Sequence, residues 1–268
     1  MQNLAGLSSA WTLWESIMVP SLLSGAGTWI GNIENTIEVC NSVQNLFWRS
    51  ILNVPKSCPK IALICETKML DMKHRIWKEK INILMRIKNL PNESLAKMIH
   101  EESMKNNWPG LGRDISQICN ILKINDLNYN YLDINEIKKA IYHHHYNEMI
   151  EKIKRCKKLS DIQNDNFKYL QKYFYDKEIN KVRLKFKIRT QMVDNIPGNF
   201  KNKYKLSRSS NCLRCNVQLS QDHIKVCPGR THLRRGLDLS KLDDLAIYFA
   251  RYVDSVSPDG DDTSVITG

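Results

Sequence analysis

The eight cysteines of this 268-residue chain lack the regular pairing that marks a disulfide framework. Three of them are clustered near the C-terminus, and the other five are scattered along the chain: Cys40, Cys58, Cys65, Cys119 and Cys156. Scattered thiols are typical of proteins from a reducing compartment. We therefore expect a nuclear or cytoplasmic protein.

The chain also lacks the segments that direct a protein into a membrane. No basic residue precedes the apolar stretch at the N-terminus, which argues against a secretory signal peptide. Residues 16–33 are uncharged, but they contain Pro20, three glycines and several hydroxyl side chains. This stretch is too weakly apolar to favour lipid, so we expect a buried helix–turn segment and no membrane partner.

Hydrophobic residues make up 42% of the sequence and recur mainly at three- and four-residue steps. This periodicity predicts a mainly α protein: a multi-helix bundle, a small metal-binding module and a C-terminal helix. Residues 72–90 give the clearest amphipathic pattern. Residues 94–105 are predicted to form a further helix, with Leu95, Met98 and Ile99 facing inward.

Two other stretches of the chain need interpretation. In residues 183–189 cations alternate with apolar residues, as in a strand, but the preceding residues 167–179 have helical spacing. We predict a helix across residues 165–192. Three consecutive histidines, residues 143–145, lie in a predicted helix over residues 134–158. Because consecutive helical residues point in different directions, we expect these three not to bind one metal together.

The most specific motif lies near the C-terminus, where two cysteines, a histidine and a third cysteine follow the pattern C-x2-C-x7-H-x3-C: Cys212, Cys215, His223 and Cys227. Three thiolates and one imidazole are soft ligands that suit Zn²⁺. The surrounding segment is polar and has little core of its own, so metal binding would stabilise its fold. We predict one structural Zn²⁺, because four protein ligands leave no open position for water.

Positive charge is concentrated in one part of the chain. The formal net charge is +12, and residues 151–215 alone hold eighteen Lys/Arg against six Asp/Glu. A local surplus of this size indicates a polyanionic partner. The candidate phosphate-binding residues are Arg183, Lys185, Lys187, Arg189, Lys201, Lys203, Lys205, Arg208, Arg214, Arg230, Arg234 and Arg235.

These patterns predict five successive regions. They are a helical region over residues 1–112, a basic helical connector over residues 113–204, a zinc module over residues 205–232, a C-terminal helix over residues 233–254 and a disordered tail over residues 255–268. The first boundary rests on the breaker cluster at residues 108–112, which holds one proline and two glycines.

Several stretches resemble the C-terminal part of non-LTR (LINE-type) retrotransposon reverse transcriptases. The matching stretches are residues 14–15, 19–23, 25–29, 44–49, 51–57, 66–67, 108–111 and 183–189, followed by the cysteine–histidine motif. Each stretch alone is weakly specific, and their order and spacing carry the resemblance. It implies a helical thumb, a connector and a C-terminal zinc knuckle that contact template RNA, nascent cDNA duplex or target DNA.

The polymerase chemistry of that family needs carboxylates that hold two divalent metals. Here Asp243 and Asp244 lie near a predicted helix, and Asp261 and Asp262 lie in the acidic tail. Neither pair follows an aromatic residue in a hairpin between apolar strands. We expect a fragment without catalytic residues, whose partner is RNA, DNA or both, and which works with a separate palm-bearing part.

Two other functions are compatible with the sequence. The chain could be a zinc-containing protein-interaction module, with the basic run as a solvated face and the Trp-rich N-terminus as the interface. It could also be an enzyme of another type, but no nucleophile and base can be paired from the sequence. The affinity of the protein for nucleic acid at two salt concentrations distinguishes the hypothesis of nucleic-acid binding from that of protein interaction.

Overall fold

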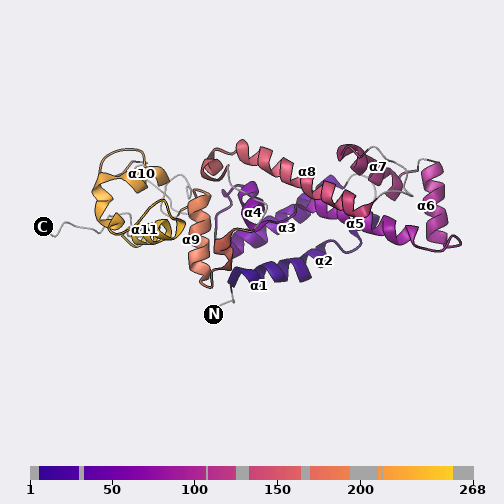
Figure 1. Ribbon diagram of the computed structural model, residues 1–268, viewed down its shortest axis with the longest axis horizontal. Coiled ribbons are helices and arrows are strands. Elements are labelled where there is room, and N and C mark those ends of the chain that lie inside the picture. Colours follow the sequence, from indigo (N-terminus) through magenta and orange to yellow (C-terminus); the bar gives the residue numbers. More distant parts are fainter. Residues whose placement is uncertain are drawn as a thin grey trace. The chain divides into compact units, whose positions relative to one another are not determined.

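The computed structural model describes residues 6–29, 33–106, 108–124, 133–163, 170–193, 211–212 and 214–255. These residues are mostly helical, as the periodicity predicts, and the helices are labelled in Figure 1. The described α-helices are α1 (Gly6–Leu13), α2 (Val19–Leu22), α3 (Glu34–Leu52), α4 (Lys60–Thr67), α5 (Met72–Lys88), α6 (Leu95–Lys105), α7 (Leu111–Ile121), α8 (Ile134–Lys154), α9 (Ile179–Arg189), α10 (Gln221–Val226) and α11 (Leu242–Ser255).

The chain divides into two compact units, and neither is one continuous segment. Unit 1 comprises residues 1–10, 48–67 and 153–268, and unit 2 comprises residues 11–47 and 68–152. Among the described helices, none combines the length and the apolar character needed to cross a bilayer. In the same residues no strand forms, and a single antiparallel bridge joins Asn211 to Gln218.

Near the N-terminus, a π-helical turn, Trp14–Met18, connects α1 to α2. The backbone N–H of Val19 donates to the carbonyl of Trp14, five residues earlier. Pro20 follows at the start of α2. Its ring excludes the regular bond to the residue four earlier, and the wider turn accommodates this loss without ending the helix.

The core of unit 2 forms where α5, α7 and α8 pack together. Its buried residues are Trp77, Ile81, Leu84, Ile115, Ile118, Cys119, Ile137 and Ile141. The ammonium group of Lys80 is buried at this contact and pairs with Asp114 at the first turn of α7. A Cβ on Gly112 would lie 1.8 Å from the sulfur of Met104, so this glycine permits the close approach of α6 and α7.

The inward orientation predicted for α6 is wrong. Leu95, Met98 and Ile99 are 70%, 53% and 54% exposed, and no residue of α6 is buried. The helix itself forms as predicted, because an amphipathic pattern fixes the helical period. The pattern does not establish that another element covers the apolar face.

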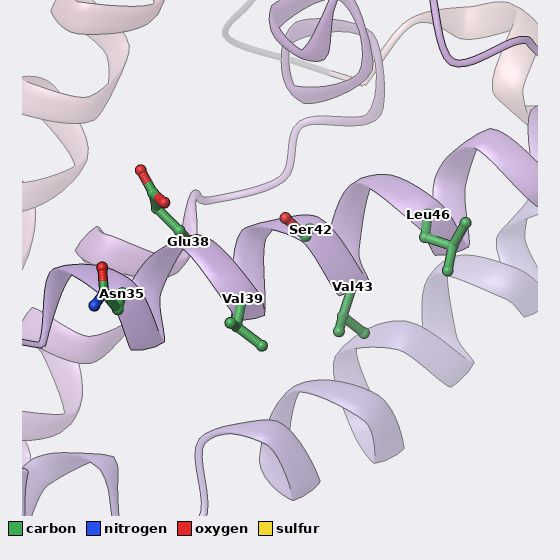
Figure 2. Close-up of a pocket in the computed structure, with 6 residues that line it drawn as sticks. All are labelled: Asn35, Glu38, Val39, Ser42, Val43 and Leu46. Atoms are coloured by element: carbon green, nitrogen blue, oxygen red, sulfur yellow. The ribbon is translucent and has the colours of Figure 1, made fainter.

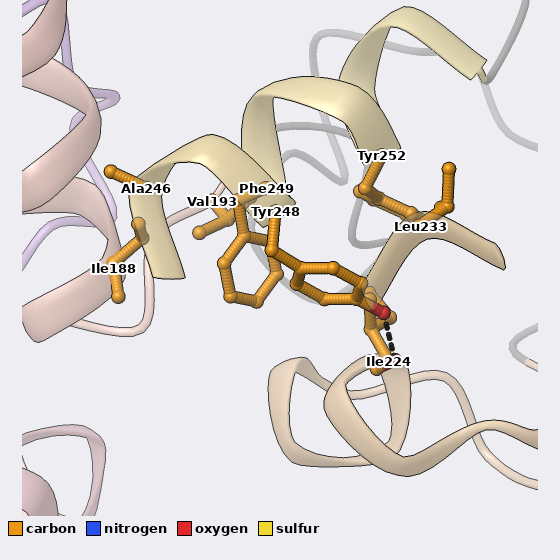
Figure 3. Close-up of a cluster of buried hydrophobic side chains, with 8 residues drawn as sticks. All are labelled: Ile188, Val193, Ile224, Leu233, Ala246, Tyr248, Phe249 and Tyr252. Carbon is orange, nitrogen blue, oxygen red and sulfur yellow. Dashed lines mark hydrogen bonds between the residues drawn. The ribbon is translucent and has the colours of Figure 1, made fainter. Parts of the chain in front are cut away.

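The C-terminal core of unit 1 is built from α9, α10, α11 and the 3-10 segment Pro228–Arg234. Figure 3 shows the phenol of Tyr248 reaching towards Ile224, whose carbonyl accepts its hydrogen bond. The buried residues of this cluster are Ile188, Val193, Ile224, Leu233, Ala246, Tyr248, Phe249 and Tyr252. The C-terminal helix predicted over residues 233–254 corresponds in part to α11, which begins at Leu242 and has its apolar side in this core.

The helix predicted across residues 165–192 is only partly correct. Residues 164–169 lie outside the described part, Lys172–Tyr175 is a short 3-10 segment, and α9 covers Ile179–Arg189 alone. The strand-like alternation in α9 has a physical explanation: Lys185 and Lys187 are buried together with Phe186 and Ile188. Cations and apolar residues thus pack inward on the same helix, which obscures its amphipathic period.

Candidate metal centre

The first two sulfur ligands of the centre lie on a tight turn. The N–H of Cys212 donates to the carbonyl of Val217 over 2.7 Å, and the N–H of Asn216 donates back to the carbonyl of Cys212 over 2.8 Å. Asn216 has φ +55°, a left-handed conformation that asparagine tolerates better than most residues. This turn brings the thiols of Cys212 and Cys215 to the same side.

The short helix α10 supplies the other two ligands. Ser220 precedes it, and its hydroxyl accepts a 3.0 Å bond from the N–H of His223, which caps the helix. The N–H of Cys227 donates to the carbonyl of His223 over 2.8 Å. His223 and Cys227 are therefore one helical turn apart, as the spacing predicts, and both side chains face the turn.

The four ligand atoms converge on one point. The sulfur of Cys227 is 3.8 Å from each of the sulfurs of Cys212 and Cys215, and the sulfur of Cys215 is 3.1 Å from Nε2 of His223. All four atoms lie within 4.8 Å of one another. Sulfurs 3.8 Å apart are not disulfide-bonded, since a disulfide is about 2.05 Å long. The set could hold one metal ion.

The protonation of the thiols differs within the set. Burial opposes ionisation of Cys212, but hydrogen bonds from the backbone N–H of Arg214 and the ring of His223 lower the pKa of this thiol to about 6. Burial and the neighbouring sulfurs of Cys212 and Cys215 raise the pKa of Cys227 to about 11. A bound dication would reverse this by displacing the Cys227 proton, so metal binding should release protons.

Three arginine side chains contact the backbone and the core next to the centre. Arg234 donates to the carbonyl of Cys227, and the guanidinium of Arg230 lies 4.7 Å from the ring centroid of Tyr252 in the core. Arg214 donates to the carbonyl of Gly229 over 3.0 Å, and a Cβ on Gly229 would lie 2.6 Å from the Arg214 side chain. Gly229 thus matters because Arg214 crosses directly above it, and no feature of its sequence context indicates this contact.

The four candidate phosphate-binding residues of α9 are engaged inside unit 1. Arg189 binds the fully buried carboxylate of Glu66, with N–O distances between 2.8 and 3.1 Å. Lys185 pairs with Asp176 and Asp243, and Lys187 is 5% exposed. Arg183 donates to the carbonyl of Ile51 over 2.8 Å. The sequence could not indicate these partners, because most of them lie far away along the chain.

The other candidate phosphate-binding residues fall into three groups. Arg214, beside Cys215, is exposed, as is Arg235, whereas Arg234 is half-buried and Arg230 is buried. Lys201, Lys203, Lys205 and Arg208 lie outside the described residues. Arg214 therefore places one exposed guanidinium group beside the centre, while Arg234 bonds to the carbonyl of Cys227 and Arg230 lies over the ring of Tyr252.

No protein-family model matches this chain, and neither the curated proteins nor the solved structures include one significantly similar to it.

Proposed function

We propose that unit 1 binds nucleic acid and that the metal centre is a structural zinc knuckle within it. The observation that carries this proposal is the distribution of charge. Unit 1 holds 26 Lys/Arg and 14 Asp/Glu, a net +12, whereas unit 2 holds 14 of each and is neutral. The whole net charge of the chain therefore belongs to the unit that contains the metal centre.

The spacing of the sulfurs supports zinc as the metal. Tetrahedral Zn²⁺ with Zn–S bonds of about 2.3 Å places its sulfur ligands about 3.8 Å apart. The two distances to the sulfur of Cys227 are both 3.8 Å. With four protein ligands the ion has no open position, so it would stabilise the turn and α10 and take no part in catalysis.

Exposed cations outside α9 are the best candidates for phosphate contacts. Among the described residues of unit 1 these are Lys56, Lys60, Lys154, Arg155, Lys157, Lys172, Lys177, Arg214, Arg235, Lys241 and Arg251. They would bind phosphates mainly through charge, which gives affinity with little sequence preference. Arg189 and Lys185 of α9, whose charges are compensated by carboxylates, would stabilise the fold.

A salt titration with matched variants tests the proposal. In one variant Arg155, Lys157 and Lys172 are changed to glutamine. In the control, three exposed lysines of unit 2 are changed in the same way: Lys105, Lys123 and Lys139. For a single-stranded RNA, each lost phosphate contact should reduce the slope of log affinity against log salt by about 0.7.

The two variants change the net charge of the chain equally, so they separate a local surface from a general charge effect. The unit 1 variant should lose slope and affinity, and the unit 2 variant should match the wild type. Equal losses in both variants, or no salt-dependent binding by the wild type, would contradict the proposal.

The resemblance to the thumb and knuckle of LINE-type reverse transcriptases fits this binding role. Asp243 and Asp244, the acidic pair nearest to the knuckle, lie at the first turn of α11. Asp243 pairs with Lys185, and Asp244 accepts a 3.0 Å bond from the N–H of Asp238. These carboxylates have structural partners, so we assign the chain a binding role beside a separate palm-bearing part.

Exposed apolar faces favour protein binding by unit 2 as a second candidate function. One is the face of α6 that contains Leu95, Met98 and Ile99. Another is a shallow groove along α3, where Figure 2 shows Val39 and Val43 on the same side and Leu46 farther along; Val39 is 63% and Leu46 66% exposed. Complexes formed through either face should persist at high salt, which nucleic-acid complexes should not. Those formed through α6 should be lost in Met98→Lys.

A further inference from the structure

A second group of metal-binding side chains lies in unit 2, between α5 and α8. His74, near the start of α5, meets His144 and Glu148 of α8, as well as Asp71 and His145. Its partners in α8 lie 70 or more positions later in the chain. The sequence shows only three adjacent histidines, whose different directions argue against a shared metal. It does not show that the fold places a fourth histidine against them.

The side chains of this group are close enough together to hold a metal ion. Nε2 of His74 lies 3.0 Å from Nδ1 of His144, and Nε2 of His144 lies 4.0 Å from the carboxylate of Glu148. One ligand atom each from His74, His144 and Glu148 can be chosen so that all three are within 4.8 Å. Two nitrogens on a zinc tetrahedron are about 3.3 Å apart, which is close to the separation of Nε2 of His74 and Nδ1 of His144. If Nδ1 of His144 binds the ion, the carboxylate of Glu148 has to adjust to this nitrogen.

Asp71 orients the buried histidine. Its carboxylate lies 3.4 Å from Nδ1 of His74 and also accepts a 2.8 Å bond from the N–H of Lys73, which caps α5. In the tautomer that carries its proton on Nδ1, His74 presents the lone pair of Nε2 to His144. A carboxylate behind a ligating histidine is a common arrangement in metalloproteins, where it fixes the tautomer and raises the basicity of the ligand.

Charged groups of both signs surround the two histidines. Burial, the largest cause, and the neighbouring cationic groups lower the pKa of His144. Glu148 accepts a 2.9 Å bond from Lys73 and is 3.6 Å from Lys152. A metal ion would displace the ammonium group of Lys73 from this carboxylate, so Lys73 competes with the ion.

We propose that His74, His144 and Glu148 form a second metal site, for a borderline divalent ion such as Zn²⁺, Co²⁺ or Ni²⁺, with Asp71 as the partner that orients His74. Two imidazoles and one carboxylate suit these ions. His74 is fully buried, whereas the side chains of His144 and Glu148 are 24% and 31% exposed, so the ion can enter from solvent. Three ligands leave a position for water, and the ion would link α5 to α8.

The alternative grouping of Asp71, His74 and His145 fits a metal less well. Asp71 already accepts bonds from Lys73 and His74, and a metal bound to it would remove the group that orients His74. His145 is also more deeply enclosed: burial lowers its pKa to about 4. Substitution of His145 therefore distinguishes the two groupings.

Zinc stoichiometry in the untagged full-length protein tests the proposal, after equilibrium dialysis against a small excess of Zn²⁺. We expect two equivalents in the wild type and one in His144→Gln and Glu148→Gln. His143→Gln is the matched control, because His143 is an exposed neighbour outside the group, and it should retain two. Cys215→Ser should lose the knuckle ion and keep the second one.

Further readouts exclude a loss that results only from misfolding. Lys73→Met should bind the second ion more tightly, since it removes the competing ammonium group, and each variant should keep the wild-type circular dichroism spectrum. A wild type with one zinc overturns the proposal. So does a second ion that survives in both His144→Gln and Glu148→Gln, or one that His145→Gln removes while His144→Gln keeps it.

Discussion

At the scale of single residues, the carboxylate of Glu66 depends on its hydrogen-bonding partners because it is fully buried. Arg189 binds it through two nitrogens, and the phenol of Tyr173 donates to it. Burial and the adjacent carboxylate raise the pKa of Tyr173 well above its usual value, so the phenol keeps the proton that it donates. The three groups satisfy one another's hydrogen bonds around a carboxylate that is fully buried.

Glu66→Gln should therefore destabilise unit 1, because it leaves the guanidinium of Arg189 without its counter-charge. Removing one partner of a buried ion pair costs about 3–5 kcal/mol, and we expect a loss near the lower limit because Arg189 is 16% exposed. Urea denaturation measures this loss. In the control, Glu178→Gln removes the exposed pair with Lys181 and should change stability by less than about 1 kcal/mol. Equal losses of stability in the two variants would show that the ion pair of Glu66 does not behave as a buried one.

Gly229 gives a second prediction at this scale. Gly229→Ala would place a methyl group 2.6–3.3 Å from three carbons of Arg214, the residue beside the ligand Cys215. Because the nearest atoms include the Cβ of Arg214, the turn itself must move, and zinc affinity measured by competition with a chelator should fall. Gly110→Ala is the matched control, since a Cβ there meets nothing within 4 Å. Unchanged affinity in Gly229→Ala would mean that the turn can shift without disturbing the ligands.

At the scale of elements, capping determines whether the six-residue α10 holds its two ligands in place. Isolated helices of this length are unstable, so the bond from the N–H of His223 to the hydroxyl of Ser220 stabilises a large part of the element. Ser220→Ala should cost about 1 kcal/mol and weaken zinc binding. Ser94 occupies the same position before α6 but makes no side-chain capping bond, so Ser94→Ala should have a smaller effect on thermal stability. Similar losses in both variants would argue against this role for Ser220.

The helices and the metal-binding turn also show how much of the fold the sequence can predict. The spacing of Cys212, Cys215, His223 and Cys227 specifies a local geometry, so it predicted the arrangement of the metal centre correctly. Helical periods were likewise sufficient to predict α5 and α11. Contacts between distant segments could not be predicted: nothing near Arg189 indicates Glu66, and nothing near residues 143–145 indicates His74. The sequence also does not show which helix faces are covered by other elements, so the exposed face of α6 was predicted to be buried.

At the scale of the whole molecule, the metal centre belongs to one unit and most of the tryptophans to the other. Unit 1 contains only Trp48 among the six tryptophans. The core that includes Ile224 links the metal centre to α9 and α11, whereas the described core of unit 2 contains no residue of the centre. Loss of the knuckle metal should therefore have effects confined to unit 1.

If the centre binds zinc as proposed, removal of the ion should lower the stability of unit 1 and leave that of unit 2 unchanged. A metal ion that binds only the folded state stabilises it according to its affinity, and without the ion the residues around α10 have little local stability. Hydrogen exchange should then show lost protection across residues 214–235 and unchanged protection in α7. Cys215→Ser provides the chelator-free comparison, because it removes one knuckle ligand and leaves His74, His144 and Glu148 intact. Loss of protection in α7 as well would show that the centre stabilises the entire chain, and unchanged protection around α10 would show that the turn folds without metal.

The effect of a chelator should be stronger at pH 6 than at pH 8, since protons compete with the metal for the thiolates.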